Sequence, residues 1–316
     1  MLAFGTTRVE LGVQTLNDDI YRLVRRGHLV EDVIRATSLL KEHGFKVYYH
    51  WMPGLPGSSP ELDFELSKKL FDDANFRPDG LKLYPTMVVA GTELEKWHRE
   101  GKYKPYDFDT MVNLLVDIKA MVPRYVRISR VLRDIPPQFI TGGPKNSLRG
   151  LLKERLQERG RECQCIRCRE YGHRARDGWE TGEPQMVRLD YEASGGREIF
   201  LSFEDERETL FGLLRLRIQD RPVPVLGQEQ EGKLAIIREL HTFGPEVPLA
   251  EQRPDAAQHK GIGKALLREA ERIAAQEFQV RRMLVLSGVG AREYYRTESD
   301  YHSLGEYMVK ELVSQP

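Results

Sequence analysis

The chain has 316 residues, and its 48 basic side chains balance 48 acidic ones, so the formal net charge is zero. The length suits two domains with a sizeable core, and 40% hydrophobic with 30% charged residues excludes a largely disordered chain. No apolar run approaches the ~20 residues of a membrane span, and no signal sequence opens the chain. With only three cysteines, we expect a cytoplasmic protein that binds no membrane.

Residues 1–118 alternate short β-branched or aromatic runs with amphipathic stretches. This pattern predicts strands at 8–13, 46–51, 80–84 and 125–129, and helices at 30–43, 60–74 and 108–121. Such alternation is typical of βαβ units on a parallel sheet. Four units do not complete an eight-unit barrel, so we expect an open sheet or a partial barrel.

The pattern of residue types changes twice further along the chain. Residues 128–176 hold proline and glycine turns, one predicted helix at 146–159 and all three cysteines, which indicates a linker-like module. From residue 185, strands are predicted at 187–191, 198–203, 210–218, 234–240 and 283–287, with a helix at 262–276. This order predicts an α+β domain with a mixed sheet. We therefore expect an α/β domain at 1–127, a linker module at 128–184 and an α+β domain at 185–316.

The strongest local motif is Gln258-x-x-Gly261-Ile262-Gly263-Lys264, between a predicted strand and an amphipathic helix. Glycines allow close approach of a ligand, and the N–H groups of a helix's first turn attract anions. A glycine-rich turn that packs a helix on a sheet is the alternative. The motif is neither a Walker loop nor a complete dinucleotide fingerprint.

The same motif resembles motif A of the GNAT acetyltransferases. The resemblance implies that residues of the preceding strand bind acetyl-CoA along their backbone, and that the motif binds its pyrophosphate. These residues are Glu239, Leu240, His241, Thr242, Gly261, Ile262, Gly263 and Lys264. Tyr294 and Tyr295 lie where that family has a tyrosine close to the CoA thiol, a group suited to general acid catalysis. We favour Tyr294 as the catalytic residue, with aromatic packing as the alternative for either tyrosine.

The three cysteines form the group Cys163-x-Cys165-x-x-Cys168. Closely spaced thiolates in a reducing compartment suit tetrahedral zinc, and His173 would complete such a site. The fourth ligand could instead be His28, His50 or a segment outside this sequence. Three unrelated reduced cysteines are the remaining alternative.

The zero net charge conceals a basic region. Residues 119–176 contain 15 Lys and Arg against 5 Asp and Glu. The candidate phosphate-binding residues are Arg124, Arg127, Arg130, Arg133, Lys145, Arg149 and Lys153. A solvated helix face with internal salt bridges is the alternative, but five acidic residues cannot neutralise fifteen basic ones. The excess therefore favours binding to a nucleic-acid backbone.

Polar residues and glycine turns also follow several strands of the first domain, as a ligand site at the carboxyl edge of a parallel sheet requires. The segments are Val9-Glu10-Leu11-Gly12-Val13-Gln14-Thr15, Arg25-Arg26-Gly27-His28, His50-Trp51-Met52-Pro53-Gly54-Leu55-Pro56-Gly57 and Leu81-Lys82-Leu83-Tyr84-Pro85-Thr86. An ordinary βα loop is the alternative for each segment. With the cysteine group and the GNAT-like tail, these segments resemble the catalytic subunit of Elongator over essentially the whole chain.

That resemblance implies a partial radical S-adenosylmethionine β/α barrel, a basic zinc-binding linker and a GNAT domain. It implies an acetyl-CoA-dependent reaction that installs a carboxymethyl group on C5 of the tRNA wobble uridine. Glu10, Gln14 and Lys82 would contact S-adenosylmethionine. The implied partners are tRNA and either other Elongator subunits or a second copy of the chain.

The family also carries an upstream Cys-x3-Cys-x2-Cys triad that holds a [4Fe–4S] cluster, and this triad is missing from these 316 residues. We therefore expect a C-terminal part of such a protein, which binds acetyl-CoA and tRNA but is inactive in the full reaction. Two alternatives remain: a GNAT-type protein lysine acetyltransferase, and a non-catalytic RNA-binding module.

Overall fold

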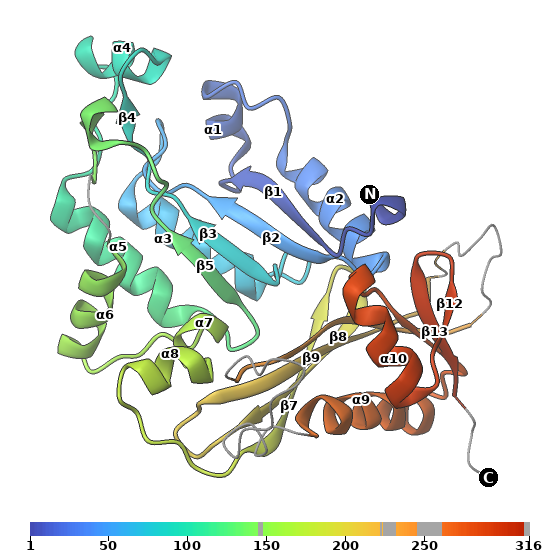
Figure 1. Cartoon of the computed structure of the whole chain (residues 1–316). Coiled ribbons are helices and arrows are strands. Elements are labelled where there is room, and N and C mark those ends of the chain that lie inside the picture. The colour runs from blue at the N-terminus through green and yellow to red at the C-terminus, as the bar shows by residue number, and fades with distance from the viewer. Residues whose placement is uncertain (145–147, 222, 224–231, 245–260, 313–316) are drawn as a thin grey trace. The chain divides into compact units, whose positions relative to one another are not determined.

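The computed structural model describes residues 1–144, 148–221, 223, 232–244 and 261–312 (Figure 1). The chain divides into two compact units. The α/β unit comprises Glu10–Thr37 and Val47–Arg167, and the mixed-sheet unit comprises Met1–Val9, Ser38–Lys46 and Cys168–Pro316. The residues 128–184, which the sequence sets apart, are therefore shared between the two units.

The α/β unit is built on a four-stranded sheet in the order β1-β2-β3-β5. Its strands are β1 (Arg8–Gln14), β2 (Lys46–Trp51), β3 (Gly80–Leu83) and β5 (Arg127–Val131). The pairs β2–β3 and β3–β5 are parallel. The four strands predicted from the alternating pattern thus form one sheet, and the expected parallel α/β architecture is confirmed.

Helices connect these strands, as the sequence predicts. The three long ones are α2 (Val30–Glu42), α3 (Pro60–Asp72) and α5 (Phe108–Met121), and the others are α1 (Asp18–Leu23), α4 (Glu93–Arg99) and α6 (Arg149–Glu158). Local chemistry sets their starts: the Ser59 hydroxyl accepts a bond from Leu62 N at 3.2 Å, and the Asp107 carboxylate from Thr110 N at 2.8 Å. A second, two-stranded sheet pairs β4 (Val88–Val89) with β6 (Ile140–Gly142).

The mixed-sheet unit contains seven strands in the order β12-β13-β11-β10-β9-β8-β7. They are β7 (Gln185–Ala193), β8 (Gly196–Glu204), β9 (Leu210–Gln219), β10 (Leu234–Thr242), β11 (Arg282–Val285), β12 (His302–Leu304) and β13 (Tyr307–Glu311). Only the β10–β11 ladder is parallel among the pairs described in this sheet. The predicted mixed sheet is therefore present.

The helices near this sheet are α7 (Ile166–Arg169), α8 (Tyr171–Arg176), α9 (Ile262–Arg272) and α10 (Arg292–Ser299). In the described parts of both units, 3-10 turns lie at Leu2–Phe4, Pro137–Phe139 and Val289–Ala291. Figure 1 shows α9 alongside the sheet. The sequence predicts that this helix continues to residue 276, but it passes into a π-helical turn at Ile273–Glu277. Ile273 and Ala274 stay buried in that turn, so the apolar pattern runs past the end of the α-helix.

One face of the mixed sheet forms an apolar core with α9. Leu214, Leu216 and Ile237 from the sheet pack with Leu266 and Leu267 from the helix, and all five are almost fully buried. Burial of side chains of this size stabilises the fold by roughly 1.5–3 kcal/mol each. This core fixes α9 against β9 and β10.

The opposite face of the sheet binds the end of α2. The carbonyls of Glu42, His43 and Phe45, at and just beyond the helix C-terminus, accept bonds from the side chains of Gln219 at 3.1 Å, Tyr307 at 2.9 Å and Arg238 at 2.8 Å. The last carbonyls of a helix lack partners within the helix, so side-chain donors stabilise its end. Residues from three strands thus hold the segment Ser38–Lys46 in this unit.

A buried charge cluster lies on the same face. Glu198 is 1% exposed, and its carboxylate lies 2.9 Å from Arg217, 2.7 Å from Arg238 and 4.0 Å from Lys41. All three cations are buried as well. A buried ion needs partners of opposite charge, so this single carboxylate stabilises cations from β9, β10 and α2.

Replacement of Glu198 by alanine should lower the free energy of unfolding by about 3–5 kcal/mol, because it removes the carboxylate from buried cations. Denaturant titration followed by circular dichroism measures the loss. Glu192→Ala is the control, since it breaks a largely exposed pair with Arg197 and should cost less than about 1 kcal/mol. Equal losses in the two variants would contradict a special role for the buried cluster.

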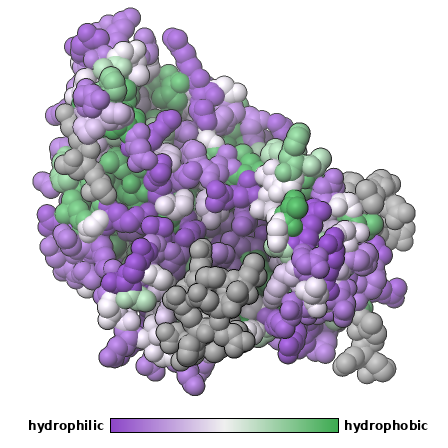
Figure 2. Space-filling view, viewed as in Figure 1, coloured by the Kyte–Doolittle hydropathy of each residue, from purple (hydrophilic) through white to green (hydrophobic). Residues whose placement is uncertain are grey.

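None of the helices in the described part of the chain is both long and apolar enough to cross a membrane. Figure 2 shows hydrophilic residues over most of the face in view. Hydrophobic residues are visible there near α1, β4 and α5.

Candidate functional site

The parallel ladder between β10 and β11 ends in the middle of the mixed sheet, where β11 ends and β10 continues along β9 to Thr242; we call this point the divergence of the two strands. Their ladder pairs Ala235 with Met283, Ile236 with Leu284 and Ile237 with Val285, and Leu286 N donates the next bond to Ile237 O at 3.1 Å. The ladder between β10 and β9 continues to Thr242. The stretch Glu239–Thr242, predicted to bind acetyl-CoA, therefore follows the point of divergence.

The helix α9 begins beside this stretch with a glycine in an unusual conformation. Gly261 has φ of +119°, and no side-chain cap accepts from the first turn of the helix. A Cβ atom on Gly263 would lie 2.9 Å from the hydroxyl of Tyr294 and 3.7 Å from Thr242 Cγ2. Glycine at 263 thus permits close approach of α9, α10 and β10.

Lys264, also predicted to bind acetyl-CoA, forms an ion pair with Glu298. Residues 258–260 of the motif lie outside the described residues.

The two candidate tyrosines have different surroundings on α10. Their rings make an edge contact with centroids 5.4 Å apart. Tyr295 is 5% exposed and belongs to the apolar core with α9, whereas Tyr294 is only partly buried and its hydroxyl lies near Gly263. Burial raises the pKa of the Tyr294 phenol above its usual value, with a further rise from the Glu298 carboxylate. The phenol is therefore protonated at neutral pH and able to donate a proton.

Glu239 and its neighbours divide into anchored and exposed residues. The Glu239 carboxylate lies 2.8 Å from Arg215 and 3.4 Å from Lys46. His241 and Thr242 are exposed at the end of the strand, and the His241 ring contacts Phe243 at a centroid distance of 4.5 Å. Glu239 is thus held in place by its side chain, whereas His241 and Thr242 face solvent.

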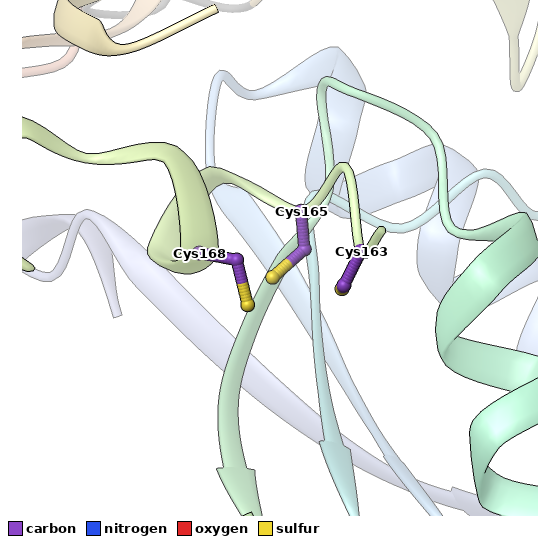
Figure 3. A group of neighbouring side chains, drawn as sticks. All are labelled: Cys163, Cys165 and Cys168. Carbon is purple, nitrogen blue, oxygen red and sulfur yellow. The ribbon is translucent and has the colours of Figure 1, made fainter. Parts of the chain in front are cut away.

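The three cysteines come together as the sequence predicts. Their Sγ atoms all lie within 4.8 Å of one another, and they are the one such group of three or more potential ligands in the described residues. In Figure 3 the Sγ atoms of Cys165 and Cys168 point toward the same space. Cys163 and Cys165 are buried. Zinc–sulfur bonds of about 2.3 Å in a tetrahedron require sulfurs about 3.8 Å apart, so three thiolates in this arrangement fit zinc.

The structure does not bring His173 into this group. Its Nε2 lies 2.8 Å from the Glu170 carboxylate, and its Nδ1 lies 2.5 Å from Arg176 Nη2. The other two candidate histidines also have other partners: the His28 ring makes a tilted contact with Tyr21, with centroids 4.7 Å apart, and His50 pairs with Glu10. The sequence alone could not distinguish these three histidines.

We expect the full chain to retain zinc through purification, and Cys165→Ser to lose most of it, because a thiolate ligand is removed. His173→Ala should retain the metal, because both ring nitrogens of His173 contact Glu170 and Arg176 rather than the cysteines. Metal content by mass spectrometry of the purified variants measures both effects. Loss of zinc in His173→Ala as complete as in Cys165→Ser would establish His173 as the fourth ligand.

The α/β unit gathers charged side chains from three adjacent strands. Glu10 on β1 forms an ion pair with Lys82 on β3, and its carboxylate lies 2.9 Å from His50 Nε2 on β2. All three side chains are about one quarter exposed. Gln14, at the end of β1, has φ of +71°, and its carbonyl accepts a bond from Met52 N at 2.8 Å. Glu10 and Lys82 therefore meet on the sheet, and His50 joins them.

The predicted phosphate-binding residues lie on β5, on α6 and in the segments that flank β5. Arg127 and Arg130 are on β5, and Arg149 and Lys153 are on α6. Arg149 Nη2 lies 3.4 Å from the carbonyl of Ile128, so α6 and β5 are close. Arg133 and Lys153 are exposed, Arg130 pairs with Asp134 at 2.9 Å, and Arg124 is half-buried. Lys145 lies outside the described residues.

Comparison with protein families first defines the class. Residues 1–64 match the model of the Radical SAM superfamily, and residues 78–158 match that of the Radical_SAM C-terminal domain. These matches cover the parallel sheet and its helices. The first part of the chain is therefore a radical-SAM-type α/β fold.

Individual relatives then define the family. The chain is 61% identical over 312 residues to "tRNA uridine(34) acetyltransferase" of Dehalococcoides mccartyi, covering 99% of this chain and 68% of that protein. It is 46% identical to the protein of the same name from Methanocaldococcus infernus, covering 59% of it, and 42% identical to human "Elongator complex protein 3", covering 57% of it. The chain belongs to this tRNA uridine(34) acetyltransferase and Elongator protein 3 family.

A solved structure agrees with this assignment. The archaeal Methanocaldococcus infernus Elp3 with an N-terminal deletion superimposes with a TM-score of 0.88 at 43% identity, over 99% of this chain and 74% of that one. The chain spans less than 60% of the length of the archaeal and human curated relatives and 68% of the bacterial one.

Several residues near the divergence were missed by sequence reasoning. Arg215 and Arg238 directly follow apolar runs in β9 and β10, and both are almost fully buried. Lys46 begins β2 and contacts Glu239, which is 193 positions away in the chain. The sequence contained one signal for these residues: an arginine next to a run of apolar residues in a buried strand needs a buried partner of opposite charge or a hydrogen-bond acceptor.

Proposed function

We propose that the mixed-sheet unit is a GNAT-type domain that binds acetyl-CoA. The observation that carries this proposal is the divergence of β10 from β11 beside the glycine-bounded start of α9. The backbone of Glu239, Leu240, His241 and Thr242 would contact the pantetheine arm, and Gly261, Ile262, Gly263 and Lys264 would contact the pyrophosphate. N–H groups at the start of an eleven-residue helix, together with its dipole, favour a bound phosphate.

When bound, acetyl-CoA would supply an activated acetyl group. Tyr294 is the residue proposed to donate a proton near the thioester, because its phenol is protonated at neutral pH and lies beside Gly263. Tyr295 is proposed to pack in the core. Glu239 already accepts from Arg215 and Lys46, so it is poorly placed to deprotonate a protein amine. This engagement disfavours a lysine acetyltransferase.

We propose that the protein acts in acetyl-CoA-dependent carboxymethylation of the tRNA wobble uridine at C5. Its relatives are named as acetyltransferases of tRNA uridine 34, and the basic residues of β5 and α6 offer contacts to phosphates. Because the chain spans only part of these relatives, acetyl-CoA binding and tRNA binding are the steps assigned to its own residues. Other Elongator subunits or a second copy are the proposed partners, in the cytoplasm.

We further propose zinc at Cys163, Cys165 and Cys168, in a basic linker that joins the two catalytic domains. Glu10, Gln14 and Lys82 would contact S-adenosylmethionine, since a carboxylate and an ammonium complement its charged groups. The Cys-x3-Cys-x2-Cys triad that holds the [4Fe–4S] cluster of the family is not among these 316 residues, so no residue of the chain is assigned to that cluster.

Gly261→Glu should weaken acetyl-CoA binding by about tenfold or more, because it places an L side chain at φ +119° and a carboxylate beside the proposed phosphate site. Isothermal titration with acetyl-CoA measures the effect. Gly195→Glu is a matched control, since Gly195 also has positive φ, at +70°, with open space around it, but lies in the β7–β8 hairpin. Unchanged affinity in Gly261→Glu would refute the proposed pyrophosphate site.

Binding of tRNA should weaken steeply as salt rises from ~50 to ~200 mM, because phosphate contacts release counterions. Arg133→Ala and Lys153→Ala, both at exposed positions, should each reduce the slope of log affinity against log salt by about 1. Filter binding at several salt concentrations measures the slope. Arg159→Ala, whose guanidinium pairs with Asp117 at 3.1 Å, is the control and should leave the slope unchanged. A flat response in the wild type would exclude this tRNA surface.

A further inference from the structure

Arg238 is the extra residue of a β-bulge in β10. In the ladder with β9, Ile237 pairs with Leu216 and Glu239 pairs with Arg215, which are neighbours in β9. The register of the ladder therefore shifts by one residue at Arg238. The side chains facing α9 show the same shift, because Ala235 and Ile237 lie on that face and Leu240, three positions later, lies on it too. A bulge of this kind bends a strand and increases its twist.

The side chain of Arg238 is held from two directions. Its Nη2 and Nε lie 2.7 and 3.1 Å from one oxygen of Glu198, and its Nη1 donates to the carbonyl of Phe45 at 2.8 Å. The residue is 0% exposed. A buried guanidinium that loses its partners is strongly unfavourable, so these bonds fix where the bulge occurs.

The divergence of the strands begins at this residue. The β10–β11 ladder ends at Ile237, one residue before the bulge, and Glu239, one residue after it, is held by Arg215 and Lys46. We propose that Arg238 is a positioning residue for acetyl-CoA: it holds the bulge that turns Glu239–Thr242 away from β11. This inference rests on the proposed acetyl-CoA site and names a residue that acts through the backbone rather than through contact with the cofactor.

Arg217 provides a matched control for this role. It is also 0% exposed and binds the other oxygen of Glu198 at 2.9 Å. Its other bonds go to the carbonyls of Ala193 and Ser194 in the β7–β8 hairpin, at 2.8 and 2.9 Å, and to Gln219 Oε1 at 2.6 Å. It lies on β9 at a regular position of the ladder. A purely structural role predicts the same consequences for Arg238→Met and Arg217→Met.

The test compares the full-length wild type with Arg238→Met, Arg238→Lys and Arg217→Met, at a temperature where circular dichroism shows each to be folded. Isothermal titration gives Kd for acetyl-CoA, and hydrogen exchange gives the protection of the amides of residues 239–242 without ligand. Both Arg238 variants should raise Kd at least tenfold and accelerate exchange at these amides. Arg238→Lys keeps the positive charge but lacks the planar guanidinium that binds two partners at once. It therefore tests the proposal even if Arg238→Met fails to fold. Arg217→Met should stay within twofold of the wild-type Kd.

The possible outcomes separate the two proposals. If the wild type binds acetyl-CoA and the Arg238 and Arg217 variants change Kd and exchange equally, or not at all, the positioning role of Arg238 is refuted and the site stands. If the wild type does not bind acetyl-CoA, the proposed site fails, and the role of Arg238 fails with it. A selective effect of Arg238 on both Kd and exchange supports both proposals.

Discussion

The mixed-sheet unit depends on the desolvated carboxylate of Glu198. Its two oxygens bind arginines from neighbouring strands, and the ammonium of Lys41 lies 4.0 Å away at the end of α2. Hydrophobic packing against α9 does not depend on the relative orientation of the side chains. Charged hydrogen bonds to a buried carboxylate, by contrast, require particular partners at particular angles. The cluster therefore specifies how β8, β9, β10 and the end of α2 are arranged on one side of the sheet.

The α/β unit uses buried carboxylates in a similar way, but toward its own backbone. Asp79 is fully buried and accepts from Val47 N at 2.8 Å, which ties β2 to the start of β3. Asp63 accepts from Gly54 N at 2.7 Å, from Ser58 at 2.6 Å and from Tyr106 at 2.9 Å, and burial raises its pKa. These bonds hold the loop that follows β2, at the edge of the sheet where ligands bind in parallel α/β folds.

Sequence periodicity was sufficient for the regular elements, because alternation and helical spacing depend on which face of each element is buried. It predicted the four parallel strands and the central strands of the mixed sheet within a few residues. It did not predict the bulge at Arg238, since the bulge is defined by how the neighbouring residues Ile237 and Glu239 pair with β9 and by the contact of Arg238 with Phe45, 193 positions away. The cysteine group was predictable because its members are close in sequence. The surroundings of His173 were not, because spacing alone does not show whether a histidine faces thiolates or Glu170.

The discontinuity of the mixed-sheet unit has a consequence for synthesis on the ribosome. The segment Ser38–Lys46 leaves the ribosome long before β10, and at roughly 5–20 residues per second the interval is on the order of 10–40 s. During that interval the carbonyl of Phe45 has water as its partner, and until β8 emerges Lys41 lacks Glu198. The unit can close only when its last strands have emerged, and a fragment that starts after residue 46 lacks part of its structure.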